Sequence, residues 1–301
     1  MITRSQRIRA LLAGAVLAAA AAAHAAPAVD VRPVGVLVLA HGGSPEWNHE
    51  VVQVAADAKL PYPSEVAFGM GMHAGEVDGM QQAIERLERA GASRIVVLPL
   101  LVSSHSEVMD QFAYLFGLHP HGPWEAEVKP LVCRVPVTLA SPLDDDPVVS
   151  SVLEARARAL SRRPERESLV LIAHGPVSDA HNAQWLGVMD RLAERLQQAV
   201  KFQTVASATL RDDAPTPVRD AAVQHLRELV QRLGYNGDVL VLPLLLSKGG
   251  IERKIPTALE GLPYRYAGET LLPHPEFSAW LRSRIDAAAN QPASGTSHTG
   301  G

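Results

Sequence analysis

The sequence is poor in cysteine, in aromatic residues and in positive charge. Cys133 is the single cysteine among 301 residues, which excludes an intrachain disulfide and a structural zinc site built on several thiolates. Lys and Arg total 28 against 32 Asp and Glu, a net charge of −4, so a nucleic-acid-binding function has no electrostatic support. The hydrophobic share is nonetheless 47%, which is typical of a folded protein and too high for a disordered one.

Apolar runs of membrane-spanning length are also missing. The longest run, residues 10–23, consists of Ala, Leu, Val and Gly and is shorter than the ~20 residues that a membrane helix needs. Three arginines precede it, and residues 23–25 (AHA) then give the small-x-small pattern of a signal-peptidase site. We therefore expect residues 1–25 to be a signal peptide and the mature protein to be periplasmic, with no integral membrane segment. An uncleaved N-terminal anchor is the alternative.

Two phrases of the sequence occur twice and in the same order. Residues 36–42 (VLVLAHG) return at 169–175 (LVLIAHG), and residues 95–101 (IVVLPLL) return at 239–245 (VLVLPLL). Two ordered matches with similar offsets indicate a duplicated domain.

Apolar stretches without polar alternation are typical of parallel strands that are buried on both faces. Such stretches predict strands at 34–39, 94–101, 169–172 and 238–246. Segments with helical periodicity lie between them, at 75–90, 183–200 and 217–233. This alternation of strands and helices predicts an α/β fold of two doubly wound parallel sheets, one in each repeat.

The repeats also set the predicted domain boundaries. We expect an N-terminal domain with the active site at 26–162, a C-terminal repeat at 163–289 and a disordered tail at 290–301. The join falls in the polar stretch 161–168, which is rich in Arg and Glu.

Histidines follow two of the predicted strands in the first repeat. His41 comes directly after the first strand and before Gly42, and His105 follows the 94–101 strand by a few residues. In such sheets ligands bind at the carboxyl ends of the strands. Imidazole binds divalent first-row metals and transfers protons near neutral pH. We expect the two histidines to form one site, although a lone histidine at a strand end is more often a hydrogen-bonded loop residue.

The segments around these histidines resemble a known family. Residues 40–44 (AHGGS) with Asn48, and residues 98–108 (LPLLVSSHSEV), are similar to the sirohydrochlorin cobaltochelatase/ferrochelatase family, the class II tetrapyrrole chelatases. Residues 272–275 (LPHP), ahead of Phe277, resemble the closing strand and helix of that family. The resemblance covers most of the mature chain and implies two flavodoxin-like domains.

The resemblance also implies an activity. Family members insert a divalent metal ion, cobalt or iron, into a tetrapyrrole such as sirohydrochlorin, and their two motif histidines bind the metal and assist deprotonation. Those roles carry over to His41 and His105. The metal, Co²⁺ or Fe²⁺, is then a substrate, the tetrapyrrole is the partner, no organic cofactor is expected, and a homodimer is compatible with the resemblance.

Neighbouring polar residues are candidates for further roles. The Glu107 carboxylate could share the proton transfer, but Ser104 and Glu107 also have the spacing of a helix capping box. Gly42, Ser44, Ser103 and Ser104 are candidates for substrate binding, and the serines serve equally well as turn residues.

The second repeat departs from the pattern of the first. His174 keeps the place of His41, but when Pro243 is aligned with Pro99, Gly249 stands opposite His105. We therefore predict a single active site in the first half and interpret His174 as a structural relic.

Other candidates are weaker. Met70 and Met72, ahead of His73, offer thioether and imidazole ligands, but core packing is the simpler role for the methionines. Family members often carry an acid near this position, and none stands here. Residues 144–147 (DDDP) are typical of a helix N-terminus. A periplasmic protein of the same fold that binds metal or haem without catalysis is the alternative function.

Overall fold

The computed structural model describes residues 33–70, 74–119 and 128–291. The predicted signal peptide, Met72, His73 and residues 292–301 of the predicted tail lie outside the described residues. Among the helices in the described part of the chain, none combines the length and the apolar character that a bilayer span requires.

The first half of the chain forms a four-stranded parallel sheet. Its strands are β1 (Val34–Ala40), β2 (Ser64–Phe68), β3 (Arg94–Pro99) and β4 (Val137–Leu139), in the order β2-β1-β3-β4. The helices along this half are α1 (Pro45–Asp57), α2 (Ala74–Arg89), α3 (Glu107–Leu115) and α4 (Pro147–Leu160).

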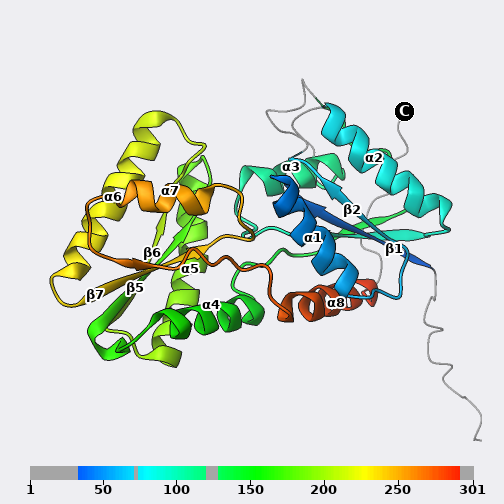
Figure 1. Ribbon diagram of the computed structural model, residues 1–301. Coiled ribbons are helices and arrows are strands. Elements are labelled where there is room, and N and C mark those ends of the chain that lie inside the picture. Colours follow the sequence, from blue (N-terminus) through cyan, green and yellow to red (C-terminus); the bar gives the residue numbers. More distant parts are fainter. Residues whose placement is uncertain (1–32, 71–73, 120–127, 292–301) are drawn as a thin grey trace, which may run out of the picture. The chain divides into compact units, whose positions relative to one another are not determined.

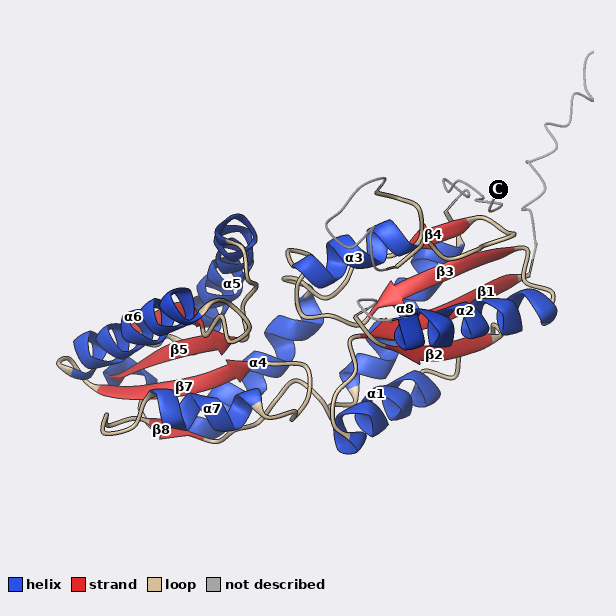
Figure 2. Cartoon of the chain, turned by 90° about the horizontal axis from the view of Figure 1, so that it is seen from above, coloured by secondary structure: helices blue, strands red, loops and turns tan. Residues whose placement is uncertain are grey.

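The second half repeats this arrangement after a short 3₁₀ turn at Pro164–Arg166. Its strands are β5 (Glu167–Ala173), β6 (Thr204–Thr209), β7 (Asp238–Leu244) and β8 (Arg265–Tyr266), in the order β6-β5-β7-β8. The helices are α5 (Asp179–Val200), α6 (Thr216–Gly234), α7 (Ile251–Ala258) and α8 (Glu276–Ala289). The two sheets, each flanked by helices (Figures 1 and 2), confirm the predicted duplicated α/β fold.

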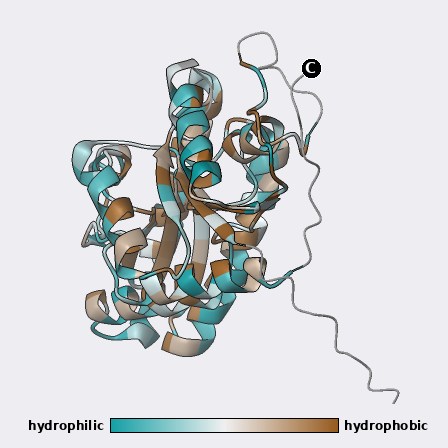
Figure 3. Ribbon diagram, turned by 90° about the vertical axis from the view of Figure 1, so that its right-hand side faces the viewer, coloured by the Kyte–Doolittle hydropathy of each residue, from teal (hydrophilic) through white to brown (hydrophobic). Residues whose placement is uncertain are grey.

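Both faces of each sheet are buried, as the continuous apolar runs require. In β1, Val36 and Val38 pack into one cluster together with Val51 of α1, whereas Leu37 and Leu39 point into another. Successive side chains of a strand point to opposite faces, so an unbroken apolar strand has apolar neighbours on both sides. Figure 3 shows apolar residues along the strands.

Each half contributes one helix to the other half. Helix α4 follows β4 in sequence but packs against α5 and β7, and α8 follows β8 but packs against α1 and β3. The α8 side chains Phe277 and Trp280 are buried in a cluster that also contains Val38 of β1 and Leu242 of β7. Neither repeat therefore covers its own sheet alone. The predicted boundary between residues 162 and 163 separates the two sequence repeats. Whether it also separates two folding units remains a prediction.

Two of the predicted strands extend two residues beyond the observed strands. The strand predicted at 94–101 ends at Pro99, and the one predicted at 238–246 ends at Leu244. In both repeats the apolar residues beyond the strand remain buried, so apolarity continues where the strand has already ended. The predicted helix start at 144–147 is confirmed, because Asp146 caps α4 and accepts a hydrogen bond from Val148 N–H at 2.9 Å.

Candidate functional site

His41 stands at the carboxyl end of β1, and its ring orientation is fixed by the chain around it. Its Nδ1 donates a hydrogen bond to the carbonyl oxygen of Gly42, which has a left-handed φ of 83°. Because a carbonyl oxygen only accepts, Nδ1 carries the ring proton and Nε2 keeps a free lone pair. The ring also lies against Trp47, with the ring centroids 4.5 Å apart. His41 therefore presents Nε2 as a metal ligand or proton acceptor.

The polar residues after His41 shape the loop that holds it. Ser44 caps α1 and accepts a hydrogen bond from Trp47 N–H at 3.3 Å. Gly43 N–H donates to Asn48 Oδ1 at 2.9 Å. These contacts give Ser44 and Asn48 a structural role, while the predicted contact of Ser44 with substrate remains a prediction.

The pKa of His41 in the first repeat depends partly on charged groups of the second repeat. Desolvation by the surrounding protein lowers the pKa of His41, the hydrogen bond to Gly42 opposes this shift, His174 lowers the pKa further and Asp213 raises it. The net pKa of His41 lies below its usual value, so its imidazole is neutral at pH 7.

His174 follows β5 as His41 follows β1, and its ring has the same orientation. Its Nδ1 donates to the Gly175 carbonyl oxygen at 2.9 Å, and its Nε2 lies 3.3 Å from Asp213 Oδ2. The interpretation of His174 as a relic does not account for this carboxylate or for the neighbouring Asp212. The two acids escaped the sequence analysis, although they follow the β6 strand at its carboxyl end, where ligands bind.

His105 lies in a turn that hydrogen bonds hold in place. Its backbone N–H donates to Ser103 Oγ at 3.1 Å, and Ser104 N–H donates to Asp144 Oδ1 at 2.7 Å. Ser103 is only 1% exposed, which favours the turn role over substrate contact. The joint site of His41 and His105 remains a prediction.

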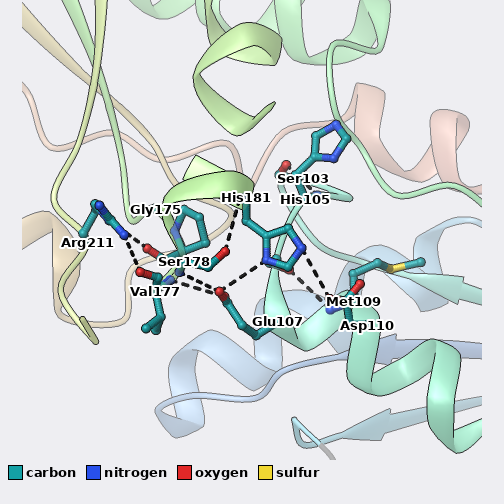
Figure 4. A network of polar contacts seen from close by, with 12 residues as sticks. Ser103, His105, Glu107, Met109, Asp110, Gly175, Val177, Ser178, His181 and Arg211 are labelled. Atoms are coloured by element: carbon teal, nitrogen blue, oxygen red, sulfur yellow. Dashed lines mark hydrogen bonds and ion pairs between the residues drawn. The ribbon is translucent and has the colours of Figure 1, made fainter. Parts of the chain in front are cut away.

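Glu107 joins the two halves instead of closing a capping box. The N-cap of α3 is Ser106, which accepts from Met109 N–H at 3.3 Å, so the alternative of a capping box between Ser104 and Glu107 is wrong. As the first residue of α3, Glu107 extends to the start of α5, where it accepts from Ser178 N–H at 2.8 Å and from Val177 N–H at 3.3 Å (Figure 4).

His181 of α5 completes this contact. Its Nδ1 lies 3.3 Å from Glu107 Oε1, and its Nε2 lies 3.3 Å from Asp110 Oδ2. Burial raises the pKa of Glu107, but the hydrogen bonds from the backbone and from His181 outweigh it and leave that pKa below its usual value. Figure 4 draws the His105 ring apart from these contacts. No sequence pattern singles out His181, which stands on an ordinary amphipathic helix.

A carboxylate also lies at the end of β2, where residues 69–73 contain no acid. Glu76, near the start of α2, accepts from Met70 N–H at 3.0 Å. A Cβ on Gly69 would lie 2.7 Å from the Glu76 Cβ, so this close approach requires glycine. The acid comes from the following helix and not from the strand end, which explains why the motif alone did not reveal it.

Gly249 lies against Trp47 of the other repeat. A Cβ at Gly249 would be 3.1 Å from Trp47 Cδ1, and Gly249 N–H donates to Glu252 Oε2 at 3.0 Å. A Cβ here would require the Trp47 ring to move by a few tenths of an ångström. The position that aligns with His105 is therefore in tight contact with the first repeat.

Gly175 holds His174 in place, and we expect Gly175→Ala to destabilise the fold. Its φ is 77°, and a Cβ would lie 2.6 Å from the Thr209 Cβ, so alanine adds both backbone strain and overlap. The expected loss in the free energy of unfolding is roughly 1–3 kcal/mol, measured by urea denaturation. Gly79→Ala, on α2 with no atom within 4 Å of the new Cβ, is the control and should leave stability unchanged or raise it. An equal response of the two variants would contradict the steric argument.

The fold and the strand-end side chains define a duplicated α/β protein with candidate metal ligands in both repeats. The CbiX family model matches residues 35–160 and again residues 168–288. The chain therefore belongs to the CbiX family, which confirms the resemblance noted from the motifs.

Individual relatives are more distant. The sirohydrochlorin cobaltochelatase of Methanosarcina barkeri is 24% identical over 125 residues, which are 42% of this chain and 95% of that protein. SirB from Bacillus subtilis with Fe³⁺ has a TM-score of 0.62 at 20% identity, over 88% of this chain and all of the other. CbiX, described as the terminal enzyme for siroheme biosynthesis in denitrifying bacteria, has a TM-score of 0.53 at 16% identity, over 84% and 99% of the two chains. At these identities the two structures support the fold alone.

Proposed function

We propose that this protein inserts a divalent metal ion into a tetrapyrrole of the sirohydrochlorin class. Membership of the CbiX family over both repeats supports metal chelation as the type of reaction. The named activity of the Methanosarcina relative supports sirohydrochlorin as the macrocycle and Co²⁺ as one metal substrate. The Fe³⁺ in the SirB structure supports iron as the other.

The observation that supports the proposal most is the protonation state of the His41 imidazole. Its Nδ1 proton is engaged by Gly42, and its pKa lies below the usual value, so a neutral Nε2 lone pair stands at the carboxyl end of a central strand. Neutral imidazole is a good ligand for cobalt and iron. A ligand that can also take a proton suits a reaction in which the metal replaces two pyrrole protons.

The insertion requires three events: the metal loses water, two pyrrole nitrogens lose protons, and those nitrogens take over the metal. We assign metal binding and proton transfer to His41, with His105 as the second imidazole. Glu107 is retained in the proposal as an ionised carboxylate that follows His105 in the sequence. Its hydrogen bonds to Ser178, Val177 and His181 favour a positioning role at the start of α5.

The proposal places the reaction in the periplasm. The arginines and the apolar run at residues 10–23, followed by the AHA sequence, support export. The tetrapyrrole would then be met outside the cytoplasm, and a delivery protein or a transporter would have to supply it.

Incubation of the purified protein with sirohydrochlorin and either Co²⁺ or Fe²⁺ tests the activity. We expect the absorbance spectrum of the free macrocycle to convert to that of the metal complex faster than in the protein-free control, because the protein removes water and protons at one site. Unchanged rates with both metals would contradict the chelatase assignment. Metal or haem retained without turnover would support the non-catalytic binding protein.

A further inference from the structure

The second repeat contains a set of metal-ligating atoms of its own. One atom each from His174, Asp212 and Asp213 lies within 4.8 Å of the others. His174 follows β5 and the two acids follow β6, so they share the carboxyl edge of one sheet. One imidazole and two carboxylates are a ligand set that first-row divalent metals accept.

The orientation of His174 turns its second ring nitrogen towards Asp213. Nδ1 donates to the Gly175 carbonyl oxygen at 2.9 Å, and Nε2 lies 3.3 Å from Asp213 Oδ2. A ring nitrogen and a carboxylate oxygen that face each other in this way can hold one cation between them, either a shared proton or a metal ion.

The net charge of the surrounding side chains favours a divalent cation. Asp212 pairs with the ammonium group of Lys254, which compensates one of the two carboxylates. The Asp213 side chain is 69% exposed, so an ion has a path from solvent. Two carboxylates and one ammonium leave a net negative charge beside the His174 imidazole.

Arg211 ties the two ligand-bearing loops together. Its backbone N–H donates to the His174 carbonyl oxygen at 2.7 Å, and its buried guanidinium donates to the Pro176 carbonyl oxygen at 3.2 Å and to Asp179 Oδ1 at 2.5 Å. The loop after β5 is thus fixed to the loop after β6 before any ligand arrives. A preorganised ligand set binds with a smaller loss of conformational freedom.

We propose that His174, Asp212 and Asp213 bind a divalent first-row cation, in addition to the metal handled by His41 and His105. The mixed nitrogen and oxygen set suits Co²⁺, Fe²⁺, Mn²⁺ or Zn²⁺ and disfavours Ca²⁺. Because His174 and His41 interact electrostatically, an ion bound here lies near the proposed catalytic histidine. This second site would hold the metal substrate before it reaches His41, and that role rests on the proposed function. The binding of a cation at His174, Asp212 and Asp213 does not depend on it.

Equilibrium dialysis of the purified protein against Co²⁺ alone tests the site by counting bound ions. We expect two ions per chain in the wild type and one in His174→Ala and in Asp213→Asn, with affinity for the lost ion falling roughly tenfold or more. The matched controls are His225→Ala, an exposed histidine on α6, and Asp220→Asn, whose side chain is 68% exposed. Both controls should bind as many ions as the wild type.

A further variant separates this proposal from the proposed function. His105→Ala should lose the first-half ion and keep the second. If the wild type and His105→Ala each bind one ion and His174→Ala binds none, the second-half site stands and the first-half assignment fails. If His174→Ala and Asp213→Asn bind as many ions as the wild type, the second-half site is refuted, and circular dichroism will show that all variants are folded.

Discussion

His41→Ala should lower kcat/KM for metal insertion about 100-fold or more, the range in which a lost proton-transfer group falls. The side chain supplies a neutral Nε2 lone pair, and the surrounding residues hold it in that state. Alanine removes both a metal ligand and a proton acceptor, and water must then take over both roles without their orientation. Initial rates of metallation at low concentrations of Co²⁺ and macrocycle measure the effect directly.

The control for this variant is His49→Ala, an exposed histidine on α1 of the same half, which should keep wild-type activity. Because the His41 ring contacts Trp47, its removal also alters packing, and thermal unfolding of His41→Ala and His41→Gln separates that effect from chemistry. Activity within twofold of wild type in a folded His41→Ala protein, together with a large loss in His105→Ala or His174→Ala, would move the chemistry away from His41.

Much of the fold was predictable because parallel strands buried on both faces need uninterrupted apolar runs. Residues 36–42 and 169–175 carry that signal, and β1 and β5 occupy equivalent places in two sheets of the same order. The exchange of α4 and α8 was not predictable. An amphipathic helix has the same periodicity whichever sheet it covers, so the pattern of α8 does not reveal that it packs against α1 and β3.

The site was predictable only where its residues directly follow a strand. His41 and His174 were found in this way, but their mutual influence depends on how two repeats pack, which no local pattern encodes. The serines at 103, 104 and 106 offered several caps for α3. In the structure Ser103 accepts from His105 N–H, Ser106 is the cap, and Glu107 contacts the start of α5.

Glu167→Ala should lower the free energy of unfolding by about 3–5 kcal/mol, the cost of removing one partner from a buried ion pair. The Glu167 side chain is 1% exposed and pairs with Arg265. It also accepts hydrogen bonds from Ser161 Oγ at 2.5 Å and from the backbone N–H groups of Arg162 and Arg163, each at 3.0 Å. One carboxylate thus joins the end of α4, the start of β5 and the β8 strand. Urea denaturation at pH 7 measures the loss, and the exposed neighbour Glu165→Ala should change stability by less than about 0.5 kcal/mol.

The contribution of Glu167 should also disappear in acid. Burial raises its pKa, but hydrogen bonds from Ser161, the Arg163 backbone and Arg265 outweigh burial and lower the pKa to about 2 from an ordinary 4.5. Since the folded state has the lower pKa, the carboxylate stabilises the fold fully above pH 4.5 and loses that effect as the pH falls towards 2, a change of about 3 kcal/mol. The stability difference between wild type and Glu167→Ala should therefore shrink as the pH falls from 5 to 3. A difference that stays constant over this range would mean that packing, and not the charge of Glu167, holds the two segments together.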